Sequence, residues 1–225
     1  MQKPFKVLYL ALFILAAKGT FADEELTYKT MKDNVRKDTK WKIEKQNTDL
    51  SIYGEDKDQA FSLLCTPQFF LSAYQQQDKQ IGKEVSIKRQ NNKLIVSSKE
   101  KKREKTKTYD IKDKAWIQEF KFGFQSFLSS TNAEYKFCIV NPKDLDIHDM
   151  IATKEAVENI TIEGKNYTAQ KIKVTLQGFR KRFWKAEVWF DKESLTLLKY
   201  RANEGPGTPM TEVTLLEKNP LAGSP

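Results

Sequence analysis

The sequence predicts a mainly β fold (α+β): one strongly curved antiparallel sheet with two short helices. Three observations lead to this prediction. Apolar and charged residues alternate along most of the chain, which is typical of half-buried strands. Only two segments depart from this alternation, so helices are few. A sheet with many strands and few helices must curl around its own core or around those helices.

The first 22 residues have the pattern of a secretory signal peptide. Lys3 and Lys6 give a positive start, residues 7–17 are an unbroken apolar run, and Thr20 and Ala22 fit a cleavage site after Ala22. The run is shorter than the roughly 20 residues that a membrane-spanning helix needs. We therefore expect an exported protein of the bacterial periplasm, either soluble or bound to a membrane only peripherally.

Residues 23–218 are expected to form a single domain, because about 200 residues without an internal repeat or linker match the usual domain size. Residues 219–225 are expected to be a flexible tail.

The net charge of the full chain is +9. Three lysines and no acidic residue lie within residues 1–22, so the mature chain carries +6. Either a solvated surface of mixed sign or attraction to anionic headgroups, glycans or another acidic partner explains this excess.

Strand spacing begins directly after the signal segment. Alternating runs occur at residues 26–30, 41–45 and 50–52, the last followed by a turn signal at residues 54–56. A hairpin is predicted over residues 85–96, because the Asn-Asn pair at its centre tolerates the positive φ of a tight turn. Residues 99–107 are dense in charge and fit either a solvated strand or an exposed connection.

Two segments have helical spacing. Residues 67–77 carry apolar side chains at i, i+1, i+4 and i+5, which favours a short helix. Residues 116–128 place large apolar side chains on one helical face, although Gly123 weakens a helix by ~1 kcal/mol. The alternation of phenylalanines in the second segment would also suit a strand.

The second half returns to strand spacing. Strands are predicted at residues 135–140, 147–151, 156–162, 167–176, 183–190, 197–202 and 211–217. A curled sheet that two helices cover incompletely leaves an apolar groove or cavity, although an ordinary packed barrel has the same sequence pattern. We expect five aromatic residues to line or plug that cavity: Trp116, Phe120, Phe124, Trp184 and Trp189.

The two cysteines allow two interpretations. Cys65 and Cys138 form an even pair in an exported chain, which fits a single disulfide. Each also lies within an apolar segment, where a buried free thiol behaves as a small apolar residue. Both alternatives stay open.

His148 is the only histidine, which excludes a multi-histidine metal site. If residues 143–149 form a strand, Asp144, Asp146 and His148 share one side and could hold a metal. A half-exposed strand with a polar face explains the pattern as well, and we expect that. The sequence contains no glycine-rich phosphate loop, paired-cysteine metal spacing or nucleophile elbow, so no catalytic residue, metal or cofactor is predicted.

Two basic segments bear on partners. Residues 99–107 contain no aromatic side chain for base stacking, and export also argues against nucleic acid as a partner. In residues 178–185, Arg180, Lys181 and Arg182 stand among large aromatics. Such a segment either faces a membrane or protein partner or forms a hairpin turn whose aromatics tuck into the core. We favour the turn.

The second half also contains a run of short motifs. Residues 162–164 (Ile-Glu-Gly) end one strand and 167–169 (Tyr-Thr-Ala) begin the next; 186–191 carry a tryptophan and an Asp turn, and 197–201 form a short strand. In these motifs residues 135–217 resemble a family of uncharacterised exported bacterial proteins related to the lipoprotein-carrier (LolA/LolB-like) superfamily. The resemblance implies an incomplete barrel with helices against its concave side. The best-known relatives shuttle acyl chains in such a cavity, and the resemblance implies no catalytic residue.

These observations together predict an exported, non-catalytic protein that binds a hydrophobic ligand, a lipid or acyl chain, in the cavity of a curved sheet. One alternative is an envelope protein with a filled core whose basic face contacts a membrane or a protein partner. A second alternative is a hydrolase-like enzyme that uses His148 with Asp146 or Asp149.

Overall fold

The computed structural model describes residues 23–46, 48–178, 184–203, 205 and 207–221. The signal-peptide segment and the basic residues Arg180, Lys181 and Arg182 lie outside the described residues. We call the first eight strands the first arm: β1 (Glu24–Lys32), β2 (Val35–Gln46), β3 (Asp49–Glu55), β4 (Gln59–Cys65), β5 (Leu71–Asp78), β6 (Lys83–Gln90), β7 (Lys93–Glu100) and β8 (Arg103–Asp110).

The remaining elements form the second arm and the segment that joins the arms. They are β9 (Ala115–Trp116), the 3-10 turn η1 (Phe120–Phe122), α1 (Gln125–Ser129), β10 (Glu134–Val140), β11 (Ile147–Ile162), β12 (Lys165–Leu176), β13 (Lys185–Asp191), β14 (Leu197–Asn203) and β15 (Met210–Pro220). In the described part of the chain no helix is long and apolar enough to cross a membrane.

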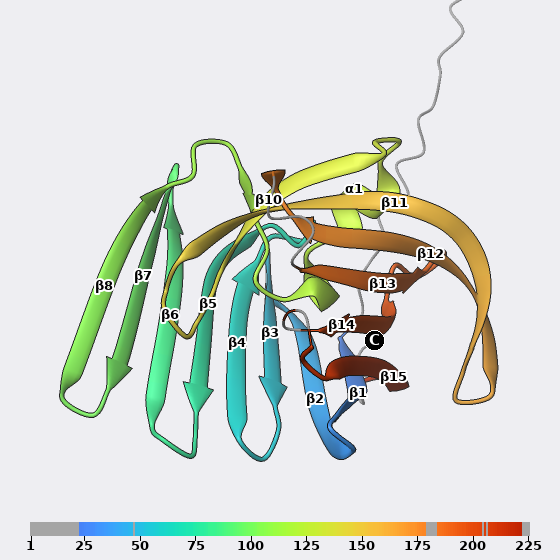
Figure 1. Ribbon diagram of the computed structural model, residues 1–225, viewed down its shortest axis with the longest axis horizontal. Coiled ribbons are helices and arrows are strands. Elements are labelled where there is room, and N and C mark those ends of the chain that lie inside the picture. The colour runs from blue at the N-terminus through green and yellow to red at the C-terminus, as the bar shows by residue number, and fades with distance from the viewer. Residues whose placement is uncertain (1–22, 47, 179–183, 204, 206, 222–225) are drawn as a thin grey trace, which may run out of the picture.

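The described strands form one 15-stranded sheet in the order β8-β7-β6-β5-β4-β3-β2-β1-β15-β14-β13-β12-β11-β10-β9 (Figure 1). Neighbouring strands are antiparallel except for the short parallel pair β9–β10. The sheet is open, with β8 and β9 at its edges, and it curves so that the second arm crosses in front of the first (Figure 1). The prediction of a mainly β protein with one antiparallel sheet is confirmed.

The predicted alternation accounts for most strands. On β2, Thr39, Trp41 and Ile43 are buried, whereas Lys40 and Lys42 between them are exposed. This pattern buries one face of the strand in the interior and leaves the other in water. The predicted hairpin is present as β6 and β7, and Asn91 in its turn has a φ of 52°.

The predicted helix at residues 67–77 is wrong: most of that segment is β5. A bulge between β4 and β5 pairs Cys65 with Leu71 and Leu64 with Ala73, so Ser72 is an extra residue. The bulge brings Leu71 and Tyr74 to the same buried face, three residues apart. A helix produces the same spacing, which is why the sequence pattern favoured one.

The segment 116–128 is only partly helical. It contains the end of β9, the turn η1 and the five-residue helix α1, so two helices are not confirmed. Gly123 ends η1, and a Cβ at this position would lie 2.4 Å from the side chain of Ile117. The chain therefore turns sharply at Gly123 instead of continuing one helix.

Two strand boundaries differ from the prediction. Residues 147–151 and 156–162 belong to one strand, β11, which has an irregularity between Lys154 and Val157. Strand β15 extends to Pro220, past the start of the tail predicted from residue 219, and the Leu221 N–H donates to the carbonyl oxygen of Asp23 at 2.9 Å.

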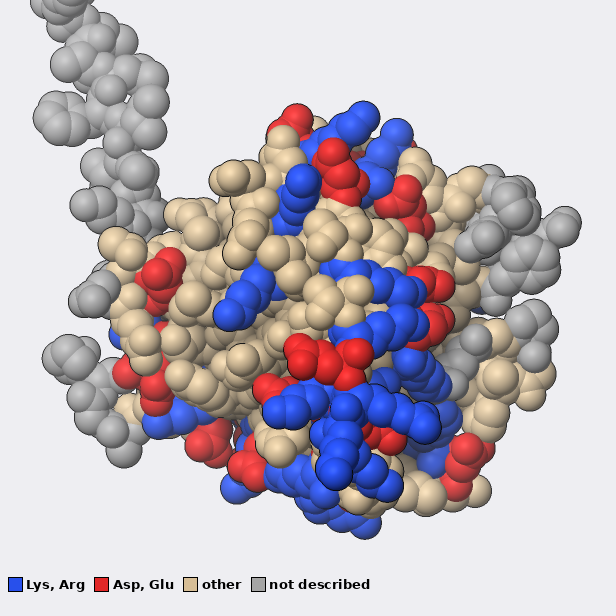
Figure 2. Space-filling view, turned by 90° about the vertical axis from the view of Figure 1, so that its left-hand side faces the viewer, with Lys and Arg blue, Asp and Glu red and all other residues tan. Residues whose placement is uncertain are grey.

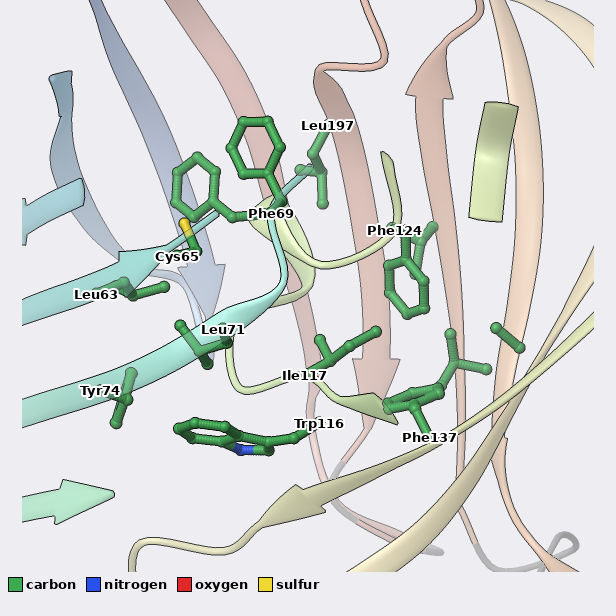
Figure 3. Packing of buried hydrophobic residues seen from close by; sticks show 14 of the residues in the cluster. Leu63, Cys65, Phe69, Leu71, Tyr74, Trp116, Ile117, Phe124, Phe137 and Leu197 are labelled. Carbon is green, nitrogen blue, oxygen red and sulfur yellow. The ribbon is translucent and has the colours of Figure 1, made fainter. Parts of the chain in front are cut away.

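The segment from β9 to α1 packs between the arms and joins their cores. Phe122 contacts Trp41 of the first arm, with ring centroids 5.1 Å apart. Phe124 contacts Phe137 at 5.4 Å and Phe190 at 5.9 Å in the second arm. Figure 3 shows Phe124 and Phe137 side by side, with side chains of β4 and β5 on the opposite side of the same interior.

Both cysteines are free thiols. Cys65 on β4 and Cys138 on β10 are buried in the apolar core, and Figure 3 shows Cys65 next to Phe69. The structure therefore contains the free-thiol alternative rather than the disulfide. Burial raises the pKa of the thiol to about 12 for Cys65 and about 11 for Cys138, so both stay protonated and unreactive near neutral pH.

Side chains connect the open edge at β8 to the loop between β10 and β11. Tyr109 donates its hydroxyl proton to the carbonyl oxygen of Leu145 at 2.8 Å, and Lys107 forms an ion pair with Asp146. Lys83 on β6 donates to the carbonyl oxygen of Pro142 at 2.9 Å. In the sheet, β8 is not paired with β10 or β11. These side-chain hydrogen bonds and the ion pair therefore hold the sheet in its curved, barrel-like shape.

Candidate functional site

A large cavity of about 800 Å³ lies between the two arms. Strands of both arms and the turn η1 form its wall. Its aliphatic lining consists of Ile139, Val140, Met150, Leu176, Leu197 and Val213. Its aromatic lining consists of Phe61, Tyr74, Phe120, Trp184 and Tyr200. Polar side chains complete it: Gln59, Gln76, Gln118, Glu119, Lys121, Asn141 and His148.

Two of the five aromatic residues predicted for the cavity line it. Phe120 projects from η1, and Trp184 precedes β13; their ring centroids are 6.4 Å apart. Phe120 also contacts Tyr200 at 6.0 Å, so the three rings form one side of the cavity wall.

Two others are buried in the packed core beside the cavity. Trp116 donates its indole N–H to Gln118 Oε1 at 3.2 Å, and Gln118 in turn donates to the carbonyl oxygen of Val140. Phe124 is fully buried among other phenylalanine rings. These two side chains support the wall but do not line the cavity.

Trp189 lies on the opposite face of the sheet. Its neighbours Val188 and Phe190 point inward, so the alternation of β13 turns Trp189 outward. The Lys171 ammonium lies 5.1 Å from its ring and the Lys199 ammonium 6.0 Å. This residue is therefore not part of the cavity.

His148 faces the large cavity from β11, but the predicted acidic cluster around it does not form. Residues 141–146 are a turn rather than a strand, closed by a hydrogen bond from the Asn141 N–H to the carbonyl oxygen of Asp146. Asp146 pairs with Lys107, and Asp149 pairs with Lys114. Among the described residues, no three His, Cys, Asp or Glu side chains gather where they could hold a metal.

A second chamber of about 470 Å³ adjoins the large cavity. Gln59, Phe61, Glu119 and Lys121 line both spaces and form the boundary between them. Inward-facing residues of β1 and β2 supply most of the remaining lining of the second chamber, namely Thr30, Lys32, Lys37, Thr39 and Trp41. Sequence reasoning missed this chamber, because only the folded sheet brings η1 over β2.

Trp41 forms the floor of the second chamber. Its ring lies over Gly54 on the neighbouring strand, where a Cβ would be only 2.5 Å from the indole. The ring stacks on Phe61 with centroids 5.3 Å apart, and Phe122 contacts it edge-on. The indole is therefore fixed in one orientation by its neighbours.

Lys121 lies where three spaces meet. It lines the large cavity, the second chamber and a third space of about 370 Å³. Its ammonium is 5.0 Å from the Trp41 ring and 5.6 Å from the Tyr28 ring, and 3.4 Å from a carboxylate oxygen of Glu119.

Burial, followed by the charge of Glu119, raises the pKa of Tyr74, another residue of the large cavity. The Tyr74 side chain therefore stays a neutral hydroxyl.

No family model matches this chain, and no curated protein sequence matches it. Among solved structures, the chain is similar to a β-barrel-like protein of the domain of unknown function DUF1849 from Brucella abortus, with a TM-score of 0.61 at 9% identity. The likeness covers 88% of this chain and 97% of that chain. At this identity the two proteins share a fold.

Two further solved structures are similar to this chain at lower TM-scores. One is a putative outer membrane lipoprotein-sorting protein domain from Vibrio parahaemolyticus, with a TM-score of 0.31, 11% identity and coverage of 91% of this chain and 87% of that chain. The other is a LolA superfamily protein from Nitrosomonas europaea, with a TM-score of 0.26, 9% identity and coverage of 88% and 85%. The LolA superfamily named for the second structure is the one that the motifs of residues 135–217 resemble.

Proposed function

We propose that this protein is an exported, non-catalytic binding protein that holds the acyl chain of a lipid in its large cavity. The observation that carries the proposal is the cavity itself, about 800 Å³ with a wall of aliphatic and aromatic side chains. Binding sites for small ligands have volumes of about 300–1,000 Å³ and mostly apolar linings with a few polar groups. The cavity has both properties.

Burial of an acyl chain would supply the affinity. Each methylene group that leaves water contributes about 0.8 kcal/mol, so a long chain gains several kcal/mol before the cost of ordering it. Wall residues such as Met150 on β11 and Phe61 on β4 come from different arms. An acyl chain bound between them contacts both arms. It fills the space that the side chains of the open sheet leave between the arms.

Export is proposed from the first 22 residues, whose pattern is that of a signal peptide. An acyl-binding protein in the cell envelope would face the lipids and lipid-modified proteins that need a dry compartment between membranes. The LolA-like motifs in residues 135–217 are consistent with that setting.

A cavity-filling variant tests the proposal. Leu176→Trp places an indole in the large cavity, and Leu64→Trp adds the same side chain on the outward face of β4, where Leu64 is 39% exposed. Titration with a fluorescent C16 fatty acid should show binding by the wild type and by Leu64→Trp. Leu176→Trp should bind at least about tenfold more weakly, because the probe and the indole compete for the same volume. Absence of binding by the wild type, together with no amphiphile in native mass spectra, would rule out the proposal.

His148 distinguishes this proposal from the hydrolase alternative. The non-catalytic function predicts that His148→Ala binds the fatty-acid probe within about twofold of the wild type, since one of many lining residues changes. It also predicts no release of p-nitrophenol from p-nitrophenyl palmitate above background. Turnover by the wild type that disappears in His148→Ala would favour the enzyme.

A further inference from the structure

The large cavity and the second chamber differ in the residue types of their linings. The large cavity is walled mainly by aliphatic and aromatic side chains, whereas lysines and threonines of β1 and β2 line the second chamber. The two spaces share Phe61 and Lys121 in their linings, so a ligand longer than either space can extend from one into the other. The boundary is therefore where the head group of a bound lipid would lie.

Trp41, which lines the second chamber, carries a buried hydrogen-bond donor. Trp41 is 1% exposed, and its indole Nε1–H has no partner among the described residues. A buried donor without an acceptor destabilises the protein, because the N–H has lost its hydrogen bond to water. Packing against Gly54, Phe61 and Phe122 prevents the ring from turning toward water. A ligand oxygen that accepts from this N–H would remove this destabilisation.

The ammonium of Lys121 adds a positive charge at the same boundary. Its contact with Glu119 is 3.4 Å, longer than the roughly 2.7–2.9 Å of a strong charged hydrogen bond. An ammonium has three donors, and the faces of Tyr28 and Trp41 are contacts that use none of them as a conventional hydrogen bond. Lys121 therefore retains capacity to bind an anionic oxygen.

Two other charged residues of the second chamber have partners within the protein. Lys37 is 2.6 Å from a carboxylate oxygen of Asp58. Asp56 accepts from the backbone N–H groups of Asp58 and Gln59 at 2.8 Å each, which fixes the turn between β3 and β4. These two groups are therefore engaged in holding the wall of the chamber.

We propose that the bound lipid carries an anionic oxygen head group, a carboxylate or a phosphate, which accepts hydrogen bonds from Lys121 and from Trp41 Nε1. The acyl chain extends from this head group into the large cavity. This assignment rests on the proposed function, because it names the ligand class of the same site.

Three amphiphiles with the same C16 chain test the assignment: palmitate, hexadecyl phosphate and hexadecanol. Displacement of a neutral fluorescent acyl probe should show that the wild type binds the two anions at least about tenfold more tightly than hexadecanol. Lys121→Met keeps an unbranched side chain over Trp41 and removes the charge, so it should abolish this preference and leave hexadecanol binding within about twofold. Lys93→Met, which removes an exposed lysine of β7, should retain the preference.

The indole proton of Trp41 gives an independent measurement should Lys121→Met fold poorly. In ¹⁵N-labelled wild type, the Trp41 Nε1–H resonance should shift downfield with palmitate but not with hexadecanol. Equal affinity for all three amphiphiles with no such shift would overturn the head-group assignment and leave the acyl carrier intact. Failure to bind any of them would overturn both. A preference for only one anion would support the assignment and identify the head group.

Discussion

Gly54 has no side chain, and the indole of Trp41 occupies the space beside it. The sequence predicts a turn at residues 54–56, but Gly54 lies within β3, paired with Trp41 on β2. Glycine within a strand often marks a close approach of another group, and here that group is the ring that floors the second chamber. The sequence alone does not show whether a glycine forms a turn or makes room for a neighbouring side chain.

Gly54→Ala should therefore destabilise the protein. The added Cβ would lie 2.5 Å from the ring of Trp41, and both the ring and the backbone of the sheet are fixed by their neighbours. We expect a loss of about 1–3 kcal/mol in the free energy of unfolding, measured by urea denaturation. Glu55→Ala, on the outward face of the same strand, should change it by less than about 0.5 kcal/mol. A neutral effect of Gly54→Ala would contradict the tight packing described for Trp41.

The site residues show which positions in the cavity can be predicted from the sequence and which cannot. Trp184 and Trp189 are five positions apart, and an odd separation along one strand turns two side chains to opposite faces. That rule alone would have placed only one of them in the cavity. Lys121 and Trp41, by contrast, lie 80 positions apart and meet only through the fold, so no local pattern links them.

At the scale of elements, β8 is an edge strand with an almost entirely exposed, polar sequence. Lysine and arginine side chains gather on the face that carries it, among acidic residues (Figure 2). A charged edge resists pairing with the edge of another molecule. The charge-dense residues 99–107, which the sequence left open between strand and connection, are thus the end of β7, a turn and most of β8.

The ion pair between Lys107 and Asp146 ties this edge to the loop between β10 and β11, and its pH dependence has a definite sign. The hydrogen bond from Lys107, then its charge, lowers the pKa of Asp146. The pair therefore stabilises the fold above the ordinary pKa of an aspartate, and that contribution is lost as the pH falls through the lowered value. Both side chains are partly in water, so the global effect is small.

A ¹³C NMR titration of the Asp146 carboxyl should give a midpoint below the ordinary aspartate range in the wild type. In Lys107→Met the midpoint should move up toward that range, because the hydrogen bond and the charge are gone. Lys114→Met removes the partner of Asp149 instead and serves as the control: the Asp146 midpoint should stay low. An unchanged Asp146 midpoint in Lys107→Met would contradict the contact at this edge.

Irregularities within strands explain the element errors of the sequence prediction. The bulge at Ser72 gives β5 a helical spacing of buried residues, and the irregularity after Lys154 makes β11 look like two strands. Both depend on the register with a neighbouring strand. Local periodicity contains no information on that register. It did identify the regular strands, because their alternation depends only on which face is buried.

At the scale of the whole molecule, the two arms meet through the pairing of β1 with β15. This pairing brings residues 24–31 next to residues 212–220, so strands from opposite ends of the described chain complete the middle of the sheet. The alternation predicted an open curled sheet, but it did not show which strands are adjacent or how large the cavity between the arms is. Those properties depend on non-local packing.

Removal of β15 should abolish cooperative folding. A chain that ends at residue 209 loses the partner of both β1 and β14, together with the buried side chains of Val213 and Leu215. These two side chains alone contribute about 1.5–3 kcal/mol each, against a total stability of about 5–15 kcal/mol for a typical domain. Differential scanning calorimetry should find no sharp transition in this chain, whereas a chain that ends at Leu221 should melt like the full-length protein. A sharp transition without β15 would show that the arms fold separately.

The same neighbourhood of β1 and β15 has a consequence for biogenesis. A ribosome makes β1 first among the described strands and β15 last, so the sheet lacks its central seam until translation of residue 220 is finished. The β1–β15 ladder is therefore the last part of the sheet that can form. Under the proposed export, this delay would keep the middle of the sheet open while the chain passes through a narrow secretion channel.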